Sequence, residues 1–340
     1  MGFIFYIIKK FVVISTILVC AISVRAESST KKNEVTPGII FQILASELSI
    51  ISGNVPAAAA TYVDIAVKTK DSEAAKRATE LSLNIGDHVT ALKTAEIWKE
   101  SSKDNPDARE AVDALQLVLG KTDELIKSMK ARRNTAHLDN SLELFYSKLS
   151  LLVKKARDPG DGLFIFETVS SQDRNLPDVL YTSALLHFGN GDVKKMELLL
   201  RKLIDLKPDH ANALNALGYS MADRGENLPE AKRLIKAAMI FSPNDPHIVD
   251  SMGWLHYRMG DLLKAEEYLS IAFANQPDPE ISAHYGEVLW MLSSKEEAMS
   301  IWRVGFNQSS NNKVLLETLT RFEISVEKLL NEENESVNSL

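Results

Sequence analysis

The feature that most constrains the fold of this chain is a repeat of about 34 residues. Glycines that can end a helix recur at intervals of 33, 34, 71, 34 and 35 residues, at Gly53, Gly86, Gly120, Gly191, Gly225 and Gly260. The interval of 71 fits two repeats with the middle glycine missing, near Lys155, and Ser293 continues the series. Prolines recur with a similar period, at Pro208, Pro243 and Pro277. A period of this length is typical of a repeated helical hairpin.

The most regular units cover residues 177–210, 211–245, 246–278 and 279–312. Small residues recur at two places in them, on the first helix at Ala184, Gly218, Gly253 and Gly286, and on the second at Ala231, Ala265 and Ala298. Helices that cross closely need Gly or Ala at the contact, so each unit is predicted to fold as a hairpin of two packed helices. Leu214, Leu217 and Met221 share one face of their helix, at the spacing i, i+3 and i+7.

One hairpin cannot bury such a face alone, whereas stacked neighbours bury it jointly. The expected fold is therefore all-α, a right-handed α-solenoid of about eight hairpins plus a C-terminal capping helix. The repeats at 39–176 are divergent and those at 177–312 are regular. A polar linker is expected at 27–38. Residues 313–340 are expected to form an amphipathic capping helix, through Leu315, Leu316, Leu319, Phe322 and Ile324, and a disordered polar tail.

The first 26 residues differ from the rest. Lys9 and Lys10 precede a short apolar run, and small residues lead to Ala26, a pattern that predicts a secretory signal peptide cleaved after Ala26. Two alternatives would leave the chain attached to a membrane: an uncleaved anchor, or a lipid on Cys20. Val19 stands where a lipoprotein signal needs a small Gly, Ala or Ser. Cleavage would remove three positive charges, taking the formal net charge from −7 to about −10.

Composition and motifs argue against several classes of function. An acidic chain lacks the dominant basic surface of a general nucleic-acid binder. The single Cys excludes a disulfide framework, and the seven His are scattered rather than clustered as metal ligands are. No phosphate-binding loop and no hydrolase or metalloprotease motif is present, and the repeats leave no room for a catalytic domain. We therefore expect a non-enzymatic protein with no catalytic residues, metal or cofactor.

The units resemble the tetratricopeptide repeat (TPR) in their small residues and closing prolines. The stretch RATELSLNIGD, with Ala95 and Trp98 beyond it, and the run from DSMGWLHYRMGD to DPEISAHYGEVLW and AMSIW resemble a group of proteobacterial envelope TPR proteins. That group includes outer-membrane lipoprotein adaptors that present cell-wall hydrolases to a periplasmic carboxyl-terminal processing protease. This chain departs from them in lacking the lipidation motif. The resemblance implies a binding scaffold rather than an enzyme.

In the resembling family, positions 2, 5, 9 and 12 of the first helix line a concave groove. The predicted partner-binding residues are those that occupy such positions in the regular repeats: Asn215, Tyr219, Asp250, Trp254, Tyr257, Glu287 and Trp290. Aromatic rings beside polar groups on a concave surface are typical of a peptide-binding site. The competing interpretation is that Trp254 and Trp290 simply pack against the helix of the next unit. His247 and His284 could also face the groove.

Charge adds one further feature. Residues 121–157 hold nine Lys or Arg and four Asp or Glu, a local charge of +5. The pattern fits a solvated helix face, or else a docking patch for an acidic partner or an anionic envelope polymer.

The predicted function is an exported, periplasmic scaffold that binds partner proteins or peptides, with an adaptor for a protease and cell-wall hydrolases as the specific hypothesis. The alternative is a structural or assembly subunit of an envelope export or outer-membrane complex.

Overall fold

The computed structural model describes residues 36–102 and 105–330, and all regular structure in these ranges is helical. The helices are α2 (Pro37–Ile51), α3 (Val55–Thr69), α4 (Ser72–Asn84), α5 (His88–Ser101), α6 (Pro106–Val118), α7 (Thr122–Leu138), α8 (Leu142–Val153), α9 (Pro159–Val169), α10 (Pro177–Gly189), α11 (Val193–Leu206), α12 (Ala211–Arg224), α13 (Leu228–Phe241), α14 (Pro246–Arg258), α15 (Leu262–Asn275), α16 (Pro279–Met291), α17 (Lys295–Gln308) and α18 (Lys313–Arg321).

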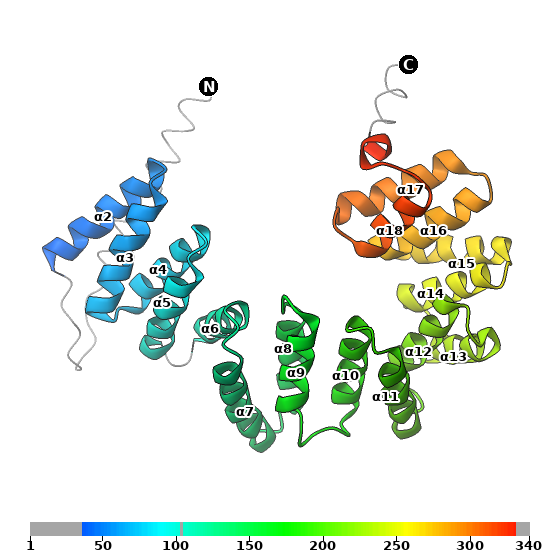
Figure 1. Cartoon of the computed structure of the whole chain (residues 1–340), viewed down its shortest axis with the longest axis horizontal. Coiled ribbons are helices and arrows are strands. Elements are labelled where there is room, and N and C mark those ends of the chain that lie inside the picture. Colours follow the sequence, from blue (N-terminus) through cyan, green and yellow to red (C-terminus); the bar gives the residue numbers. More distant parts are fainter. Residues whose placement is uncertain (1–35, 103–104, 331–340) are drawn as a thin grey trace, which may run out of the picture. The chain divides into compact units, whose positions relative to one another are not determined.

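Consecutive helices form eight helix–turn–helix pairs, from α2 and α3 to α16 and α17, and α18 follows the last pair (Figure 1). This confirms the expected all-α architecture of about eight hairpins and a cap; the handedness of the array stays a prediction. The predicted signal peptide, most of the predicted linker and the predicted tail from residue 331 lie outside the described residues. Helix α2 begins at Pro37, two residues earlier than expected, with the Thr36 hydroxyl accepting from the amide of Ile39 at 3.3 Å.

Contacts divide the chain into two units, residues 1–115 and 116–340. The predicted boundary at 176/177 separates divergent from regular repeats, which is a different distinction, and it stays a prediction. In the N-terminal unit an apolar cluster runs through α3, α4 and α5 to Ala108 at the start of α6. In the C-terminal unit successive clusters run from α7 to α10, from α10 to α14 and from α15 to α18. Each cluster joins neighbouring hairpins, as joint burial in a solenoid requires.

The turns explain the glycine period. All six glycines of the series have positive φ, between 67° and 87°, which glycine adopts without a Cβ penalty. Ser293 takes the same place in the last hairpin with φ 71°. Where the series skips a glycine, α8 ends at Val153, and no residue of the described turn before Pro159 has positive φ. The turn between α8 and α9 therefore needs no left-handed residue, which accounts for the missing glycine.

Gly218 and Gly253 mark the contact between the two helices of a hairpin. A Cβ added at Gly218 would lie 2.7 Å from Cγ1 of Ile235, and one at Gly253 would lie 2.6 Å from Cγ of Leu269. A Cβ at Gly286 would overlap the indole of Trp302. The small residues of the repeat are thus required by close helix packing, as the sequence predicts.

The C-terminal cap differs from the single helix expected over 313–330. Helix α18 ends at Arg321, and Glu323 has φ 57°. The chain then turns back, so that Ile324 and Leu329 are buried in the same cluster as α16 and α17, and Nε of Arg303 donates to the carbonyl of Leu329 at 2.8 Å. The cap is therefore a short helix, a turn over residues 322–325 and a second helical stretch that begins at residue 326.

Candidate interaction face of the C-terminal repeats

The first helices of the C-terminal hairpins form one layer. Helices α12 and α14 pack against each other, as do α14 with α16 and α16 with α18, whereas α13 and α15 have no comparable mutual contact. Figure 1 shows α12 and α14 on one side of these repeats and α13 and α15 on the other. The layer whose helices are closest together is the one on the inside of the local curvature. We call it the inner layer.

All seven predicted partner-binding residues belong to helices of this inner layer. Asp250, Trp254 and Glu287 are buried, with exposed fractions of 3–5%. Tyr219, Tyr257, Trp290 and Asn215 are half-buried. Oδ1 of Asn215 is buried without a hydrogen-bond partner among the described residues. The predicted residues thus share one helix layer, but much of that layer is covered by the chain itself, and their role in partner binding stays a prediction.

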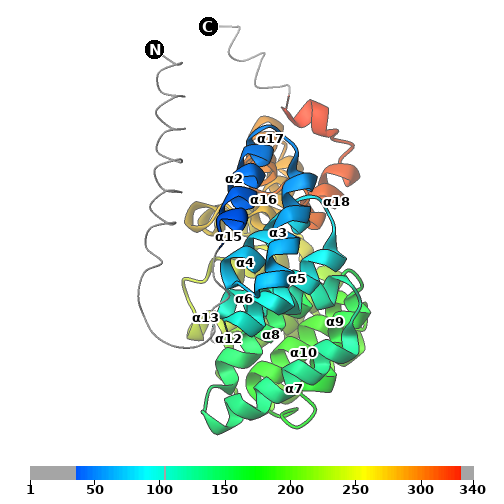
Figure 2. The same cartoon turned by 90° about the vertical axis from the view of Figure 1, so that its left-hand side faces the viewer.

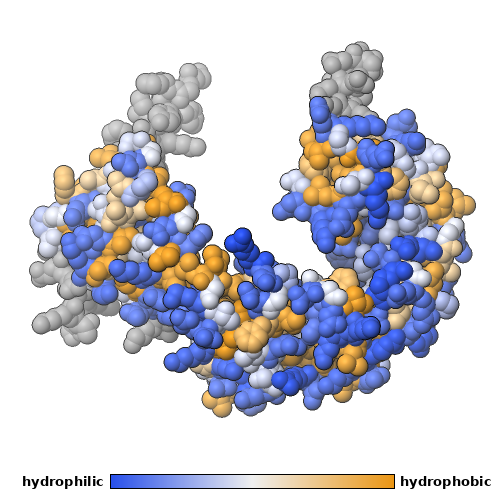
Figure 3. Space-filling view, viewed as in Figure 1, coloured by the Kyte–Doolittle hydropathy of each residue, from blue (hydrophilic) through white to orange (hydrophobic). Residues whose placement is uncertain are grey.

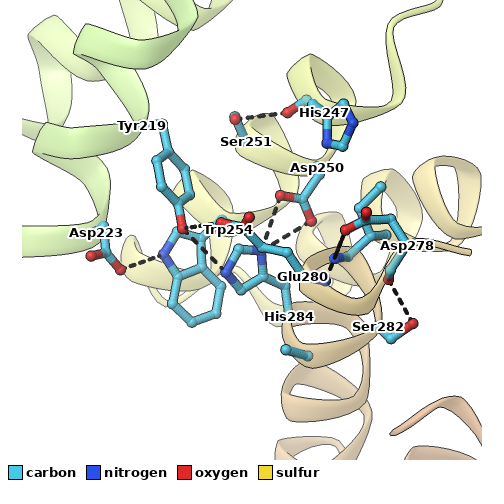
Figure 4. Close-up of polar contacts among 12 residues, drawn as sticks. Tyr219, Asp223, His247, Asp250, Ser251, Trp254, Asp278, Glu280, Ser282 and His284 are labelled. Carbon is cyan, nitrogen blue, oxygen red and sulfur yellow. Dashed lines mark hydrogen bonds and ion pairs between the residues drawn. The ribbon is translucent and has the colours of Figure 1, made fainter. Parts of the chain in front are cut away.

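A polar network joins three successive helices of the layer. His284 on α16 places Nδ1 3.0 Å from both carboxylate oxygens of Asp250 on α14. The hydroxyl of Tyr219 on α12 donates to Oε1 of Glu280 at 3.1 Å and lies 3.4 Å from Nε2 of His284. Figure 4 shows His284 between the side chains of Asp250 and Tyr219. Because each contact crosses from one hairpin to another, the network fixes the stacking of the repeats.

Trp254 completes this network as a packing residue. Its ring stacks on the imidazole of His284, with centroids 4.1 Å apart, and on Tyr257 at 4.8 Å. Its Nε1 donates to Oδ1 of Asp223 at 3.1 Å. Trp254 is 3% exposed, so nearly all of its ring is covered by the chain's own side chains. This burial favours the packing interpretation of Trp254 over a partner-binding ring.

The buried groups have shifted pKa values. Burial acts to lower the pKa of His284, but the Asp250 carboxylate, with Glu280 and Glu287 nearby, raises it overall. Burial, together with the charge of Glu280, raises the pKa of Tyr219 well above its usual range. Burial and the neighbouring Glu287 carboxylate raise the pKa of Tyr257 to about 12. The two tyrosines are therefore neutral hydrogen-bond donors at physiological pH.

A second set of contacts joins α14, α16 and α18. The hydroxyl of Tyr257 donates to Oε1 of Glu287 at 2.9 Å, and Nη2 of Arg321 contacts Oε2 of the same carboxylate. Glu287 is buried, whereas the Arg321 side chain is 55% exposed. The carboxylate thus holds one tyrosine and one arginine at the surface of the inner layer.

Beside these groups lies a depression of about 500 Å³, which we call the α14–α18 depression. Its lining residues are Trp254, Tyr257, Arg258, Gly260, Leu262, Glu287, Met291 and Arg321. Met291 is 50% exposed and Arg258 is exposed, and among the described residues Arg258 forms no ion pair. The depression thus combines an aromatic ring, a flexible thioether and two guanidinium groups, which suits an apolar side chain next to a carboxylate.

Trp290 packs against aromatic side chains of the last hairpin and the cap. Its ring stacks on Trp302, with centroids 5.5 Å apart, and packs against Phe322 at 5.8 Å. Nζ of Lys295 lies 5.0 Å from its centroid. Trp290 therefore attaches the cap to the last hairpin, and its exposed part is shielded by a lysine.

Sequence reasoning missed Arg258, Met291 and Arg321. Arg258 and Met291 directly follow Tyr257 and Trp290, at position 13 of their units. The predicted groove positions ended at position 12, so these two residues were left out. Arg321 belongs to the cap, where no repeat register applies. Its position against Glu287 arises only from the packing of α18 on α16.

The basic segment 121–157 is partly structural. Arg133 is buried, and its Nε donates to Oδ2 of Asp173 at 2.6 Å while Nη1 donates to Gln172 at 2.7 Å. The Tyr146 hydroxyl donates to the same carboxylate. Most other basic residues of the segment, among them Lys127 and Lys130, are exposed. Arg133 is thus excluded from any docking patch on this segment.

Neither a metal site nor a membrane span is found in the described residues. No group of three or more His, Cys, Asp or Glu there is arranged to hold a metal ion. None of the helices in those ranges has both the length and the apolar character that crossing a membrane requires.

Comparison with known proteins finds a local similarity in this face. Residues 251–302, which run from α14 to α17, match the family model described as tetratricopeptide repeat. Over 183 residues, or 52% of this chain, the sequence is 37% identical to the TPR repeat-containing protein PA4667 of Pseudomonas aeruginosa. The match spans 31% of that protein's length, about a third. These matches show that the chain is similar to tetratricopeptide repeat proteins in the part they cover.

Two solved structures to which this chain is similar are tetratricopeptide repeat proteins. A thermophilic TPR protein of Thermus thermophilus is 20% identical with a TM-score of 0.46, covering 52% of this chain and 94% of its own. A tetratricopeptide repeat protein of Parabacteroides merdae is 17% identical with a TM-score of 0.49, covering 73% of this chain and 97% of its own.

Proposed function

We propose that this chain is a non-enzymatic scaffold that binds a partner protein in the α14–α18 depression. The tetratricopeptide repeat is a fold suited to protein–protein interaction, since stacked hairpins present an extended surface. The observation that carries the proposal is that two arginines, Arg258 and Arg321, line the same depression as the exposed Met291 and Tyr257. A partner segment with an apolar side chain beside a carboxylate fits this surface.

The buried network supports the same function. Tyr257 and Arg321 are already held by Glu287 through the 2.9 Å hydrogen bond and the ion pair, so a partner meets side chains that are fixed in place. Such preorganisation lowers the entropy cost of binding. Trp254 and His284 support this surface from below without contacting the partner.

For the partner we propose an exported protein, and for the chain an adaptor role in the periplasm. The sequence pattern of the first 26 residues supports export, with Glu27 as the mature N-terminus. The resemblance of DSMGWLHYRMGD and RATELSLNIGD to envelope adaptors supports a protease and its cell-wall hydrolase substrates as partners. Mass spectrometry of the purified protein tests the export step: a lipid on Cys20 or a retained leader would contradict it.

Affinity purification from an envelope extract, followed by titration of the recovered partner, tests the function. Met291→Ala and Arg258→Glu should each weaken binding at least ~10-fold if these residues contact the partner. Leu263→Ala and Arg233→Glu are matched controls, because both residues are exposed on helices outside the inner layer. Equal binding by all four variants would refute the site. Recovery of a protease with hydrolases supports the adaptor role, whereas recovery of an export complex supports the assembly-subunit alternative.

A further inference from the structure

Helix α2 is apolar on both sides, although only one side is packed. Ile39, Ile43 and Ile50 contact the cluster of the N-terminal unit. The opposite side exposes five large apolar residues, Ile40 (42%), Phe41 (72%), Leu44 (45%), Leu48 (65%) and Ile51 (57%). A helix that is apolar all round is normally buried all round. The free side of α2 therefore lacks a covering element among the described residues.

The position of α2 explains why this side is free. Helix α2 lies at the end of the N-terminal unit, where its main packing partner is α3, and Figure 2 shows α2 beside α3 at that end. Figure 3 shows apolar surface over this part of the unit. The last hairpin of the chain, by contrast, is covered by α18 and by Ile324 and Leu329. Solenoids need a polar cap at each end to stay soluble as monomers, and α2 is not polar.

The exposed side is also free of charge. Phe41, Leu44, Leu48 and Ile51 follow one another at steps of three and four residues, so they form a continuous stripe. Glu47 is the one charged residue of α2, and it accepts a hydrogen bond from the Tyr62 hydroxyl at 2.7 Å and pairs with Nε of Arg77 at 3.2 Å. Its charge is thus neutralised toward α3 and α4. No charge on the stripe would select a partner of opposite sign.

The chain's remaining segments are poorly suited to cover the stripe. Residues 27–35 read ESSTKKNEV and residues 331–340 read NEENESVNSL, and neither contains an apolar run. The apolar run of residues 11–22 would be lost with the leader, a step that rests on the export proposed above. An intermolecular contact is then the way to bury the stripe.

We propose that a second copy of this chain covers the stripe, so that two α2 helices pair in a symmetric homodimer. An uncharged apolar stripe is complementary to itself, which is what a two-fold interface requires. Five side chains losing on the order of 100 Å² each would give roughly 1,000 Å² over both copies, the lower limit for a specific interface. The i, i+3, i+7 spacing matches the seam of paired helices.

The test is the molar mass of the purified protein by analytical ultracentrifugation over a concentration series. The unmodified protein should sediment as a dimer at micromolar concentration, and Leu44→Glu with Leu48→Glu should weaken dimerisation at least ~100-fold. Leu263→Glu, which places one such charge at a 72% exposed leucine of α15, should leave the dimer intact. Circular dichroism checks that all variants keep their helices. A monomeric wild-type protein at ~100 μM would overturn the proposal.

A cross-linking experiment provides a second, independent readout. The mature chain has no cysteine once the leader with Cys20 is removed, so one can be introduced alone. Ala45→Cys lies beside the stripe and should form a disulfide-linked dimer under mild oxidation, because two paired α2 helices bring the thiols together. Ala274→Cys, exposed on α15, is the control and should remain monomeric on a non-reducing gel. Equal cross-linking of the two variants, or a dimer that persists in the double glutamate variant, would refute pairing through α2.

Discussion

His284 and Asp250 are 34 residues apart, one repeat, and their side chains meet with Nδ1 3.0 Å from both carboxylate oxygens. Other contacts of the inner layer also join residues about one repeat apart. Asp223 and Trp254 are separated by 31 residues, and Glu287 and Arg321 by 34. The period that repeats the hairpins thus also sets the register of the polar contacts between them. These contacts yield specific predictions.

The stability of the C-terminal unit should depend on pH through His284. The pKa of His284 is raised above its ordinary value of 6.5 in the folded state. The protonated pair with Asp250 therefore stabilises the fold fully below pH 6.5, and its contribution is lost as pH rises through the higher folded pKa. The difference in melting temperature between wild type and His284→Gln should be greatest at mildly acidic pH and shrink toward alkaline pH.

The control for this experiment is His88→Gln, at a half-buried position of α5 in the other unit of the chain from Asp250. Its melting temperature should follow that of the wild type at every pH. A wild-type advantage over His284→Gln that stays constant, or grows with pH, would show that the imidazole acts only by packing.

Gly253→Leu should strongly destabilise the repeats. The first added carbon already lies 2.6 Å from Cγ of Leu269 and 3.2 Å from the Ala265 carbonyl, so the helices of the hairpin must separate. Overpacking of this kind typically costs ~1–3 kcal/mol. Chemical denaturation measures the loss. Gly189→Ala is the control, because nothing lies within 4 Å of its added Cβ and it should be neutral or slightly stabilising.

Tyr257→Phe should destabilise the fold by ~1–3 kcal/mol, because it leaves a buried carboxylate oxygen of Glu287 without its donor. The phenyl ring keeps the stacking on Trp254, so the change isolates the hydrogen bond. A double-mutant cycle with Glu287→Gln measures the coupling by denaturation. Additive effects of the two substitutions would mean that the contact contributes nothing of its own.

Asp173→Asn should destabilise the C-terminal unit by ~3–5 kcal/mol, since it leaves the buried Arg133 without a counter-charge. The Arg133 guanidinium holds the pKa of Asp173 below its ordinary value. The pair therefore stabilises the fold above the ordinary pKa of the carboxyl, 3.8, and this stabilisation disappears as pH falls through the lower folded pKa. Denaturation at neutral and acidic pH should show the variant's deficit diminishing in acid, whereas Lys127→Gln, at an exposed position, should have no deficit.

Much of the fold was accessible from the sequence because it depends on local rules. Glycines with positive φ end helices wherever they occur, and small residues at fixed positions let two adjacent helices cross. The number of hairpins and the helix face that carries the aromatic residues followed from that period. The short cap did not, because the turn at Glu323 is stabilised by the burial of Ile324 and Leu329 rather than by a local turn signal.

For the candidate site, the sequence predicted the helix face but not which of its side chains are exposed. Sequence periodicity places Trp254 and Tyr257 on one face, but it cannot tell which of them the next hairpin covers. Whether a side chain of this face is buried depends on which residues of the next hairpin pack on it. His284 from α16 stacks on Trp254, whereas Tyr257 lines the depression together with Arg321 of the cap. The sequence alone determined the repeat and its inner face. Which side chains of that face remain free for a partner was decided only by tertiary packing, because exposure depends on contacts between residues a whole repeat apart.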